Sequence, residues 1–176
     1  MKYQMKSKTL RKCFGWPSSL ELVAAPAAIL NQWCSNVREE IPERIIDRMH
    51  EIMKENSGAG LAAPQVGIGL RFFIIDAFNG IPQNPLVIIN PFIISSSTDN
   101  SIYNEGCLSV PGIQLPVSRP SQISVAYQSS FDSDVIELYL SDIDARVFLH
   151  EYDHLNGILF TKRFSHMFDY HKNKES

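Results

Sequence analysis

The stretch His150-Glu151-Tyr152-Asp153-His154 combines the residue types and the spacing of a hydrolytic metal site. On a helix, its two histidines lie one turn apart on the same face, so both imidazoles can bind one ion. The glutamate between them can accept a proton from a water molecule at that ion. The pattern therefore indicates metal-assisted hydrolysis, but it leaves the substrate open.

Two histidines do not complete a catalytic site, because such sites typically have three protein ligands and one open position. The metzincin proteases share H-E-x-x-H and take a third histidine from a position that is Phe160 in this chain. His166 and Asp169 remain as downstream candidates. Only a short tail follows His154, however, and its length argues against a protease lobe.

Cys107 offers a third ligand upstream of the histidines. Its neighbour Gly106 permits a sharp backbone path, and Leu108 places an amide beside the thiolate. With His150 and His154, it would give one thiolate and two imidazoles, with one position open for water. This donor set suits zinc, and also iron, cobalt or nickel.

The elements that must position these residues are predicted to be two helices and several short strands. Apolar residues at helical spacing place one helix over residues 42–56, and an S-x-x-D start places a second from Ser141 to about Gly157. Segments rich in Ile, Val, Phe and Tyr predict strands over residues 70–76, 86–90, 122–127 and 135–140. We therefore expect an α+β fold, with an N-terminal helix and antiparallel β-sheets packed around a central metal-binding helix.

The second helix is predicted to bury the face that carries its histidines. Ile143, Val147, His150 and His154 follow one another at offsets of 4, 3 and 4, and so form one stripe. A buried stripe would suit a hydrolytic site, because a dry surrounding strengthens the field of an ion.

Two segments predict loops. Gly58-Ala59-Gly60-Leu61-Ala62-Ala63-Pro64-Gln65 is too rich in small residues for a long helix or strand, so we expect a tight loop whose backbone another chain can approach. Asn79-Gly80, with Pro82 nearby, predicts a hairpin turn.

Composition and charge exclude several classes of protein. The 176 residues are 44% hydrophobic and 20% charged, as is typical of a globular domain. A net charge of −3 argues against general nucleic-acid binding, and no apolar run is long enough to span a bilayer. Three cysteines without a secretory pattern favour a reducing compartment.

The chain is predicted to form a single catalytic domain over residues 21–165 with a segment on either side. Residues 1–20 begin with several basic residues and no acidic one, so we expect a solvated basic extension. A basic, acid-free start is also found in organelle transit peptides, and this alternative stays open. Residues 166–176 are expected to form a short C-terminal tail.

Three motifs resemble the peptide deformylase family when they are taken together and in order. They are the segment of residues 58–65, Glu105-Gly106-Cys107-Leu108-Ser109, and His150-Glu151-Tyr152-Asp153-His154-Leu155-Asn156-Gly157. Val110-Pro111-Gly112 and Val117-Ser118-Arg119-Pro120 extend the resemblance, which covers roughly residues 22–165. It implies a metal-dependent hydrolase that removes the formyl group from the formyl-methionine start of nascent polypeptides.

The resemblance also implies roles for individual residues. Glu151 would take a proton from water and deliver it to the leaving amine as formate departs. The side-chain amide of Gln65 and the backbone N–H of Leu108 would donate to the oxyanion of the tetrahedral intermediate. The ligands of the ion would be Cys107, His150 and His154. One divalent ion is implied, with Fe²⁺ as the physiological metal and Zn²⁺, Ni²⁺ or Co²⁺ as alternatives.

Four residues are expected to contact the substrate. Gly58 and Gly60 would let an extended peptide hydrogen-bond to the loop backbone, because no Cβ intrudes there. Ile143 and Val147 precede the histidines on the same helical face and would line a pocket for the methionine side chain. A plain core role for these two residues is the alternative.

Three charged residues are expected to support the site from outside. The resemblance implies that Arg119 pairs with Asp153, and Glu105 would orient a ligand in a similar way. Any of the three could instead be a surface charge.

Two other functions stay open. A non-catalytic relative that binds peptide N-termini would not need Glu151, and an H-E-x-x-H metalloprotease would not need Cys107 as a ligand. We expect a protein of the bacterial cytoplasm that contacts neither nucleic acid nor membrane. By the resemblance it would act near the ribosome, although the tail beyond Phe164 is shorter and less basic than the C-terminal helix that some bacterial members use to dock there.

Overall fold

A computed structural model describes residues 15–76 and 85–164, and over these residues the strands form two antiparallel sheets. The larger sheet has the order β1-β2-β3-β6-β7, with β1 (Gly60–Ala62), β2 (Phe72–Ile75), β3 (Leu86–Ser96), β6 (Gln122–Gln128) and β7 (Ile136–Ser141). The smaller sheet pairs β4 (Asn100–Cys107) with β5 (Val110–Pro120). The α+β class and the antiparallel sheets expected from the sequence are therefore confirmed.

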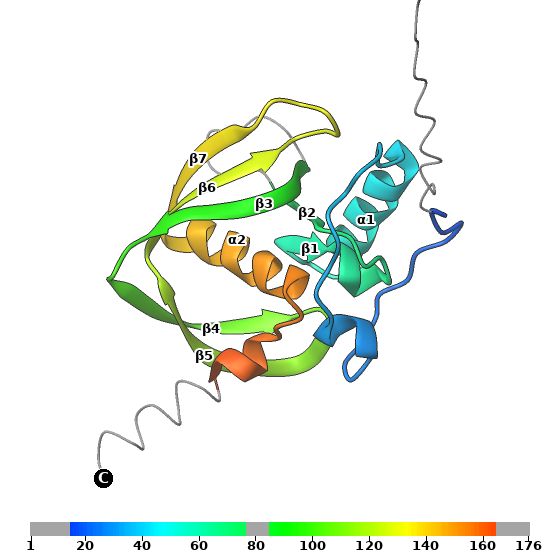
Figure 1. Cartoon of the computed structure of the whole chain (residues 1–176). Coiled ribbons are helices and arrows are strands. Elements are labelled where there is room, and N and C mark those ends of the chain that lie inside the picture. The colour runs from blue at the N-terminus through cyan, green and yellow to red at the C-terminus, as the bar shows by residue number, and fades with distance from the viewer. Residues whose placement is uncertain (1–14, 77–84, 165–176) are drawn as a thin grey trace, which may run out of the picture.

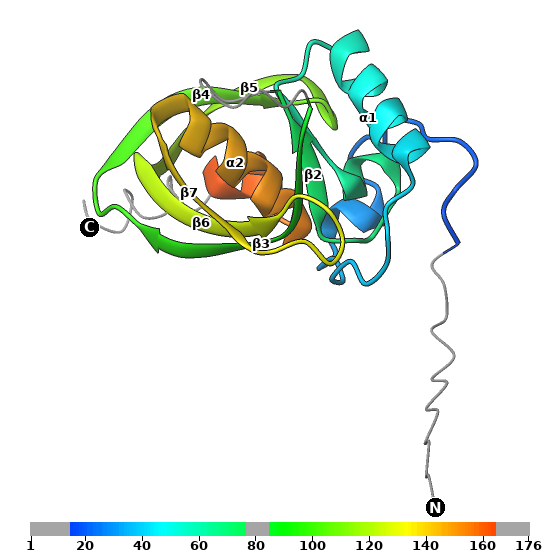
Figure 2. The same cartoon turned by 90° about the horizontal axis from the view of Figure 1, so that it is seen from above.

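Two long helices lie on different sides of the β1–β2 end of the larger sheet. α2 (Asp142–Leu155) lies between the larger sheet and the β4–β5 pair, as Figure 1 shows. α1 (Glu43–Glu55) lies outside this arrangement and packs against β1 and β2 (Figure 2). Two short 3-10 helices, η1 (Ala28–Asn31) and η2 (Ala63–Val66), connect the elements near that end. α2 is thus enclosed between two sheets, and it contains residues 150–154.

β2 divides the core into two clusters, because successive side chains of a strand point to opposite faces. Phe72 and Ile74 join the cluster that packs around α1, whereas Phe73 and Ile75 join the cluster that packs around α2. All four side chains are fully buried. Phe73 meets Phe148 of α2 edge to face, with ring centroids 5.2 Å apart. This packing anchors α2, and with it the two histidines, to the sheet.

Both helices and the strands predicted from apolar patterns are confirmed, with shifts of a few residues at their ends. Three strands, β1, β4 and β5, are absent from the sequence-based prediction. β5 contains three prolines, which argue against a strand because proline cannot donate to the ladder. The structure accommodates them because β5 pairs with β4 alone. The predicted hairpin turn at Asn79-Gly80 lies outside the described residues.

The expected loop over residues 58–65 is partly wrong. Its middle forms β1, which pairs with β2 from Gly60 to Ala62, and its end forms η2. The S-x-x-D start correctly marks Ser141 as the residue before α2, but the Ser141 side chain makes no capping hydrogen bond. The small residues Gly60 and Ala62 explain why a strand forms where a loop was expected. They let β1 lie fully buried between α1 and α2.

The expectation that α2 buries its histidine stripe needs correction. The residues that pack α2 into the core are instead Ala145, Phe148, Leu149 and Leu155. On the histidine stripe, Ile143 is 61% exposed, while His154 is 1% exposed. The stripe therefore runs from solvent at the start of α2 to the protein interior at its end.

The chain before α1 also contributes to the core. Leu20 is buried in the α1 cluster, and the Trp16 ring meets Phe72 edge to face at 6.3 Å. These residues belong to the segment that the sequence suggests as an extension. Within the described part of the chain, no helix has the length and apolar character needed to cross a membrane.

Candidate metal centre

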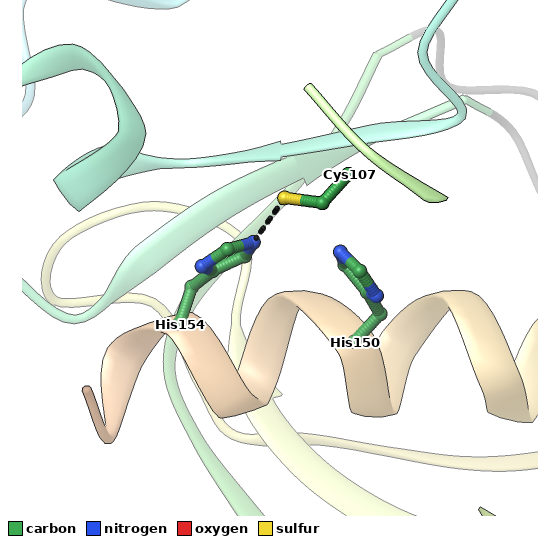
Figure 3. Close-up of side chains that lie close together, drawn as sticks. All are labelled: Cys107, His150 and His154. Carbon is green, nitrogen blue, oxygen red and sulfur yellow. Dashed lines mark hydrogen bonds between the residues drawn. The ribbon is translucent and has the colours of Figure 1, made fainter. Parts of the chain in front are cut away.

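Three side chains that can bind a metal converge between α2 and the end of β4. The ligand atoms of Cys107, His150 and His154 all lie within 4.8 Å of one another. Cys107 Sγ is 3.3 Å from His154 Nε2, and Figure 3 shows the thiol and both imidazoles pointing toward one another. The structure therefore brings together the three residues that the sequence analysis proposes as ligands.

Local backbone geometry places Cys107 at this point. Cys107 pairs with Val110 across a two-residue turn, so the thiol lies where β4 turns back into β5. A shift in register between Glu105 and Cys107 coincides with Gly106, where the absence of a side chain permits the irregularity. Glu105 and Cys107 are two positions apart on β4, and both side chains turn toward α2, where Glu105 contacts His150 and Cys107 contacts His154.

The hydrogen bonding of His150 fits the binding of an ion. Its Nδ1–H donates to Glu105 Oε2 at 3.0 Å, which leaves Nε2 as the ring nitrogen available to a metal. One thiolate and two imidazoles are a common donor set for catalytic zinc and related ions. The donor chemistry and the tautomer of His150 therefore both fit a bound divalent ion.

An ionic network behind the ligands joins β4, β5 and α2. Arg119 donates from Nε to Glu105 Oε1 at 2.6 Å and from Nη2 to Glu105 Oε2 at 2.9 Å. Its Nη1 donates to Asp153 Oδ2 at 2.8 Å. Glu105, Arg119 and Asp153 are each at most 6% exposed, so none of them is a surface charge. The network holds β4 and β5 against the helix that carries the histidines.

The charges of this network shift the ionisation of Glu105. Burial alone would raise the pKa of this carboxyl, but hydrogen bonds from His150 and Arg119 and the charge of Arg119 lower it to about 2. Glu105 is therefore ionised near neutral pH and can act only as a hydrogen-bond acceptor.

Two arginines of the network were not found from the sequence. Arg146 donates from Nη1 to Glu105 Oε1, and Arg163 donates from Nε to Asp153 Oδ2 at 3.0 Å. Arg146 precedes His150 by one helical turn, a spacing that is visible in the sequence. The sequence did not mark Arg146 as a member of the network, because an arginine on an amphipathic helix is usually exposed.

Glu151 lies buried beside the candidate ligands. It is 4% exposed, and among the described residues its Oε2 has no hydrogen-bond partner. Burial raises the pKa of Glu151 to about 7, although the charges of His150 and Arg119 partly oppose this shift. A carboxylate with a free oxygen and a pKa near neutrality can both take up and release a proton.

Gln65 connects η2 to the turn between β4 and β5. Its Oε1 accepts a hydrogen bond from the backbone N–H of Ala62 at 2.8 Å. Its Nε2 donates to Cys107 Sγ at 3.5 Å and to Ser109 Oγ at 3.3 Å. The amide is 1% exposed and has a fixed orientation, with its NH₂ group toward the candidate metal centre. Ser109 is a further contact that the sequence analysis did not single out.

Gly58 and Gly60 are required by neighbouring side chains of the same chain. A Cβ on Gly60 would lie 2.7 Å from Glu151 Oε1, and a Cβ on Gly58 would lie 2.9 Å from Leu108 Cδ1. The sequence suggests that these glycines make room for a peptide. In the structure the space beside each α-carbon is taken by Glu151 and Leu108, so the glycines set the positions of those two residues.

We predict that Gly60→Ala will lower kcat about 10²-fold through displacement of Glu151. The added Cβ would lie 2.7 Å from Glu151 Oε1, so the carboxylate would have to move. The measurement is the rate of hydrolysis of the substrate that the motif resemblance implies, together with metal content. Gly69→Ala is a matched control, because a Cβ there meets nothing within 4 Å. Equal activity of the two variants would contradict the prediction.

A pocket of about 680 Å³ opens next to the candidate metal centre. Ile143, Val147 and Ile113 contribute apolar side chains to its wall. Of the residues proposed from the sequence, the pocket is lined by Gly58, Gly60, Gln65, Glu105, Cys107, Leu108, Ile143, Val147, His150 and Glu151. Ile143 thus lies at an exposed part of the pocket wall, and the alternative of a plain core role does not apply to it. The arrangement allows a ligand of peptide size to reach Glu151 and the candidate ligands from solvent.

The chain is similar to known proteins over most of its length. The family model for polypeptide deformylase matches residues 19–169. A peptide deformylase of Thermotoga neapolitana is 45% identical over 125 residues, which are 71% of this chain and 73% of that protein. The crystal structure of the Thermotoga maritima peptide deformylase superposes with a TM-score of 0.75 and 38% identity, covering 82% of this chain and 97% of that one.

A second solved relative carries a peptide. It is the Met-Ala-Ser-bound class I type b peptide deformylase of Acinetobacter baumannii, which is 34% identical with a TM-score of 0.74. The comparison covers 82% of this chain and 97% of that one. Since the family model spans most of the sequence and the relatives share both sequence and fold, the chain belongs to the peptide deformylase family of enzymes.

Proposed function

We propose that this chain hydrolyses the N-formyl group of formyl-methionine at the start of nascent polypeptides and releases formate. The observation that carries this proposal is the convergence of Cys107, His150 and His154 beside the buried carboxylate of Glu151, in a chain of the deformylase family. The peptide bound to the Acinetobacter baumannii relative begins with methionine, as a deformylated product would.

Cys107, His150 and His154 would hold one divalent ion. When bound, such an ion supplies Lewis-acid stabilisation of hydroxide and of developing negative charge near neutral pH. We propose Fe²⁺ as the native ion and Zn²⁺, Ni²⁺ or Co²⁺ as ions that the same donor set accepts. Anaerobic metal analysis combined with activity measurements distinguishes among them.

Glu151 would move the proton that the reaction requires. Its Oε2, which has no hydrogen-bond partner within the described part of the chain, can take a proton from the attacking water and pass it to the nitrogen of the leaving amine as the C–N bond breaks. Burial favours the protonated form that is needed for the second step, since it raises the pKa of Glu151. A carboxylate in this position therefore suits hydrolysis of an amide more than simple binding of a peptide.

Gln65 and Leu108 would stabilise the oxyanion that forms from the formyl carbonyl. The Gln65 amide has its NH₂ group held beside Cys107, and the Ala62 hydrogen bond fixes its orientation. The backbone N–H of Leu108 belongs to the turn that follows Cys107. Donors that are already in position lose little on reorganisation, which is why such groups lower a barrier effectively.

The substrate peptide would bind along β1. β1 is the first strand in the order of the larger sheet, so one of its sides is open to pairing with an extended chain. Gly58 and Gly60 lie on this side of the pocket, and Ile143 and Val147 lie on the α2 side. We propose that the methionine side chain occupies the apolar part of the pocket between them.

We also propose the bacterial cytoplasm as the location of the enzyme, near ribosomes that supply its substrate. The catalytic domain would comprise residues 21–165 together with Trp16 and Leu20, which pack into its core, with the basic start of residues 1–20 before it and residues 166–176 after it. Neither nucleic acid nor a membrane is proposed as a partner, in keeping with a net charge of −3.

Formate release from a formyl-Met peptide tests the proposed function directly. Anaerobically prepared, iron-loaded protein should release formate, and the same peptide without its formyl group should remain intact. A relative that only binds peptide N-termini would bind both peptides and release nothing. Absence of formate from protein with one equivalent of iron would therefore rule the proposal out.

We predict that Gln65→Glu will lower kcat about 10²–10³-fold, the usual effect of losing one oxyanion donor. The carboxylate can still accept the hydrogen bond from the Ala62 N–H, but it has no N–H to donate. The measurement is kcat at saturating formyl-Met peptide. Ser109→Ala is the control, because it removes a partner of the Gln65 amide and leaves the amide in place. Wild-type kcat in Gln65→Glu would argue against an oxyanion role.

A further inference from the structure

Arg146 is an arginine of α2 that lies buried behind the candidate metal centre. Its exposed fraction is 5%, although it lies on a helix whose preceding turn faces solvent at Ile143. Its Nη1 donates to Glu105 Oε1 and to the Val117 carbonyl at 3.0 Å. Its Nη2 donates to the carbonyl of Ser101 at 2.8 Å and to its Oγ at 3.1 Å. Both terminal nitrogens are therefore engaged within the protein.

These contacts converge on the carboxylate that holds His150. Glu105 Oε1 accepts from Arg119 Nε at 2.6 Å and also from Arg146 Nη1. Glu105 Oε2 accepts from Arg119 Nη2 at 2.9 Å and from His150 Nδ1 at 3.0 Å. Each oxygen thus receives two donors, and the orientation of the carboxylate is determined on both sides. Arg119 alone could not fix this orientation as fully, because it leaves Oε1 with a single donor.

Arg146 and His150 contact the same carboxylate because of their spacing on α2. They are one turn apart on α2, so the helix presents the guanidinium and the imidazole to the same carboxylate of β4. The Ser101 and Val117 carbonyls belong to β4 and β5. Arg146 therefore connects the helix that carries the histidines to the strands that carry Cys107.

The environment of Arg146 argues against direct contact with substrate. Although Arg146 borders the pocket, its Nη atoms are occupied by four acceptor atoms of the protein. The Tyr103 ring lies 5.0 Å from the guanidinium carbon. Within the ionic network, the two buried carboxylates of Glu105 and Asp153 match the two buried guanidinium groups of Arg119 and Arg146, whereas the Arg163 side chain is 45% exposed. A substrate group could reach Arg146 only after these bonds were broken.

We propose that Arg146 is a positioning residue for the metal centre. It holds Glu105 so that Oε2 receives His150 Nδ1, and thereby keeps the other nitrogen of the imidazole directed to the ion. This inference rests on the proposed function in one respect, namely that Cys107, His150 and His154 hold an ion. Loss of an outer partner of this kind typically weakens metal binding about 10- to 100-fold.

The test is the rate at which zinc-loaded protein loses Zn²⁺ to excess EDTA, measured on the full chain. Arg146→Met should lose zinc about 10- to 100-fold faster than wild type. Arg146→Lys keeps a charge beside Glu105 but cannot reproduce the forked contacts to β4 and β5. It should therefore retain zinc better than Arg146→Met. Ser101→Ala, which removes one contact of Arg146 outside the Glu105 carboxylate, should lose zinc at the wild-type rate.

A double-mutant cycle with Glu105→Gln separates positioning from general support of the fold. If Arg146 acts through Glu105, Arg146→Met will not accelerate zinc loss further in the Glu105→Gln background. Equal acceleration in both backgrounds, or zinc loss as fast in Arg146→Lys as in Arg146→Met, would overturn the inference. Where Arg146→Met does not fold, Arg146→Gln takes its place in the cycle.

Activity is measured separately, so that the two proposals can fail independently. If wild type releases no formate, the proposed function fails while the zinc cycle still reports on Arg146. If wild type releases formate and Arg146→Met loses zinc at the wild-type rate, only the present inference fails. We expect Arg146→Met, kept saturated with metal, to lower kcat more than it changes KM, because the substrate does not contact the guanidinium.

Discussion

Glu151→Gln should lower kcat/KM for a formyl-Met peptide about 10²–10⁴-fold, while the protein keeps its full equivalent of metal. The substitution preserves the size and shape of the buried side chain but removes its ability to carry a proton. Glu151 lies next to the candidate ligands and is not one of the three side chains that converge on the metal position. The two measurements are formate release and the metal content of the same preparation.

An exposed glutamate, Glu51, supplies the matched control for Glu151→Gln. Glu51→Gln also neutralises a glutamate on a helix, but the Glu51 side chain is 61% exposed and its ion pair with Arg48 lies on α1. We expect it to have wild-type activity. If Glu151→Gln matched this control, Glu151 would not carry the proton. The result would then support the alternative hypothesis that the chain is a non-catalytic relative that binds peptide N-termini.

The pH profile gives a second test of the role of Glu151. Burial raises the pKa of Glu151 to about 7 in the metal-free protein, and a bound cation would lower it. A base must be ionised to accept a proton, so kcat/KM should fall with decreasing pH, with its midpoint at or below about pH 7. This limb should disappear from the residual activity of Glu151→Gln. An unchanged acid limb in that variant would assign the titration to another group.

Cys107→Ala should bind no stoichiometric metal and release no detectable formate. The variant would leave two imidazoles and would remove the only negative charge among the three proposed ligands. Outer partners of a metal site already affect affinity about 10- to 100-fold, and loss of a ligand should exceed that effect. The measurements are metal content after dialysis, by elemental analysis, and formate release with iron or zinc added in excess.

Cys34→Ala is the matched control for Cys107→Ala. Cys34 is also a free cysteine, but it lies in the α2 core cluster with 1% of its surface exposed. Burial raises the pKa of its thiol to about 11, so it is not a ready thiolate ligand. We expect Cys34→Ala to keep both metal and activity. Retention of metal by Cys107→Ala, together with cleavage of internal peptide bonds, would favour the metalloprotease alternative.

The metzincin alternative is also weakened by the fold itself. Phe160, which occupies the position of the third histidine in those proteases, is 1% exposed and lies with its ring 6.2 Å from that of His150. Its side chain offers no ligand atom. His166 and Asp169, the other downstream candidates, lie outside the described residues. The upstream thiol of Cys107 is the side chain that the structure places beside both histidines.

Sequence patterns were most informative where the determining interactions are local. The two helices and four of the strands followed from periodic apolar residues, because a helix or a half-buried strand shows its own period in the chain. β4 and β5 escaped this reasoning, since both carry mostly exposed or half-exposed residues and β5 contains three prolines. Pairing with each other stabilises them, and no single-strand pattern reports such pairing.

The same distinction between local and tertiary determinants applies to the residues of the candidate site. The sequence alone was enough to identify His150, Glu151 and His154, because the spacing of one helical turn is a local property. Cys107 became a candidate through its neighbours Gly106 and Leu108, and the resemblance of motifs then favoured it over the downstream residues. Tertiary contacts alone decided that Gly60 makes room for Glu151, that Leu20 joins the core, and that Arg146 binds a carboxylate 41 residues away. A buried charge needs a partner to offset its desolvation, and only the fold determines which distant residue supplies it.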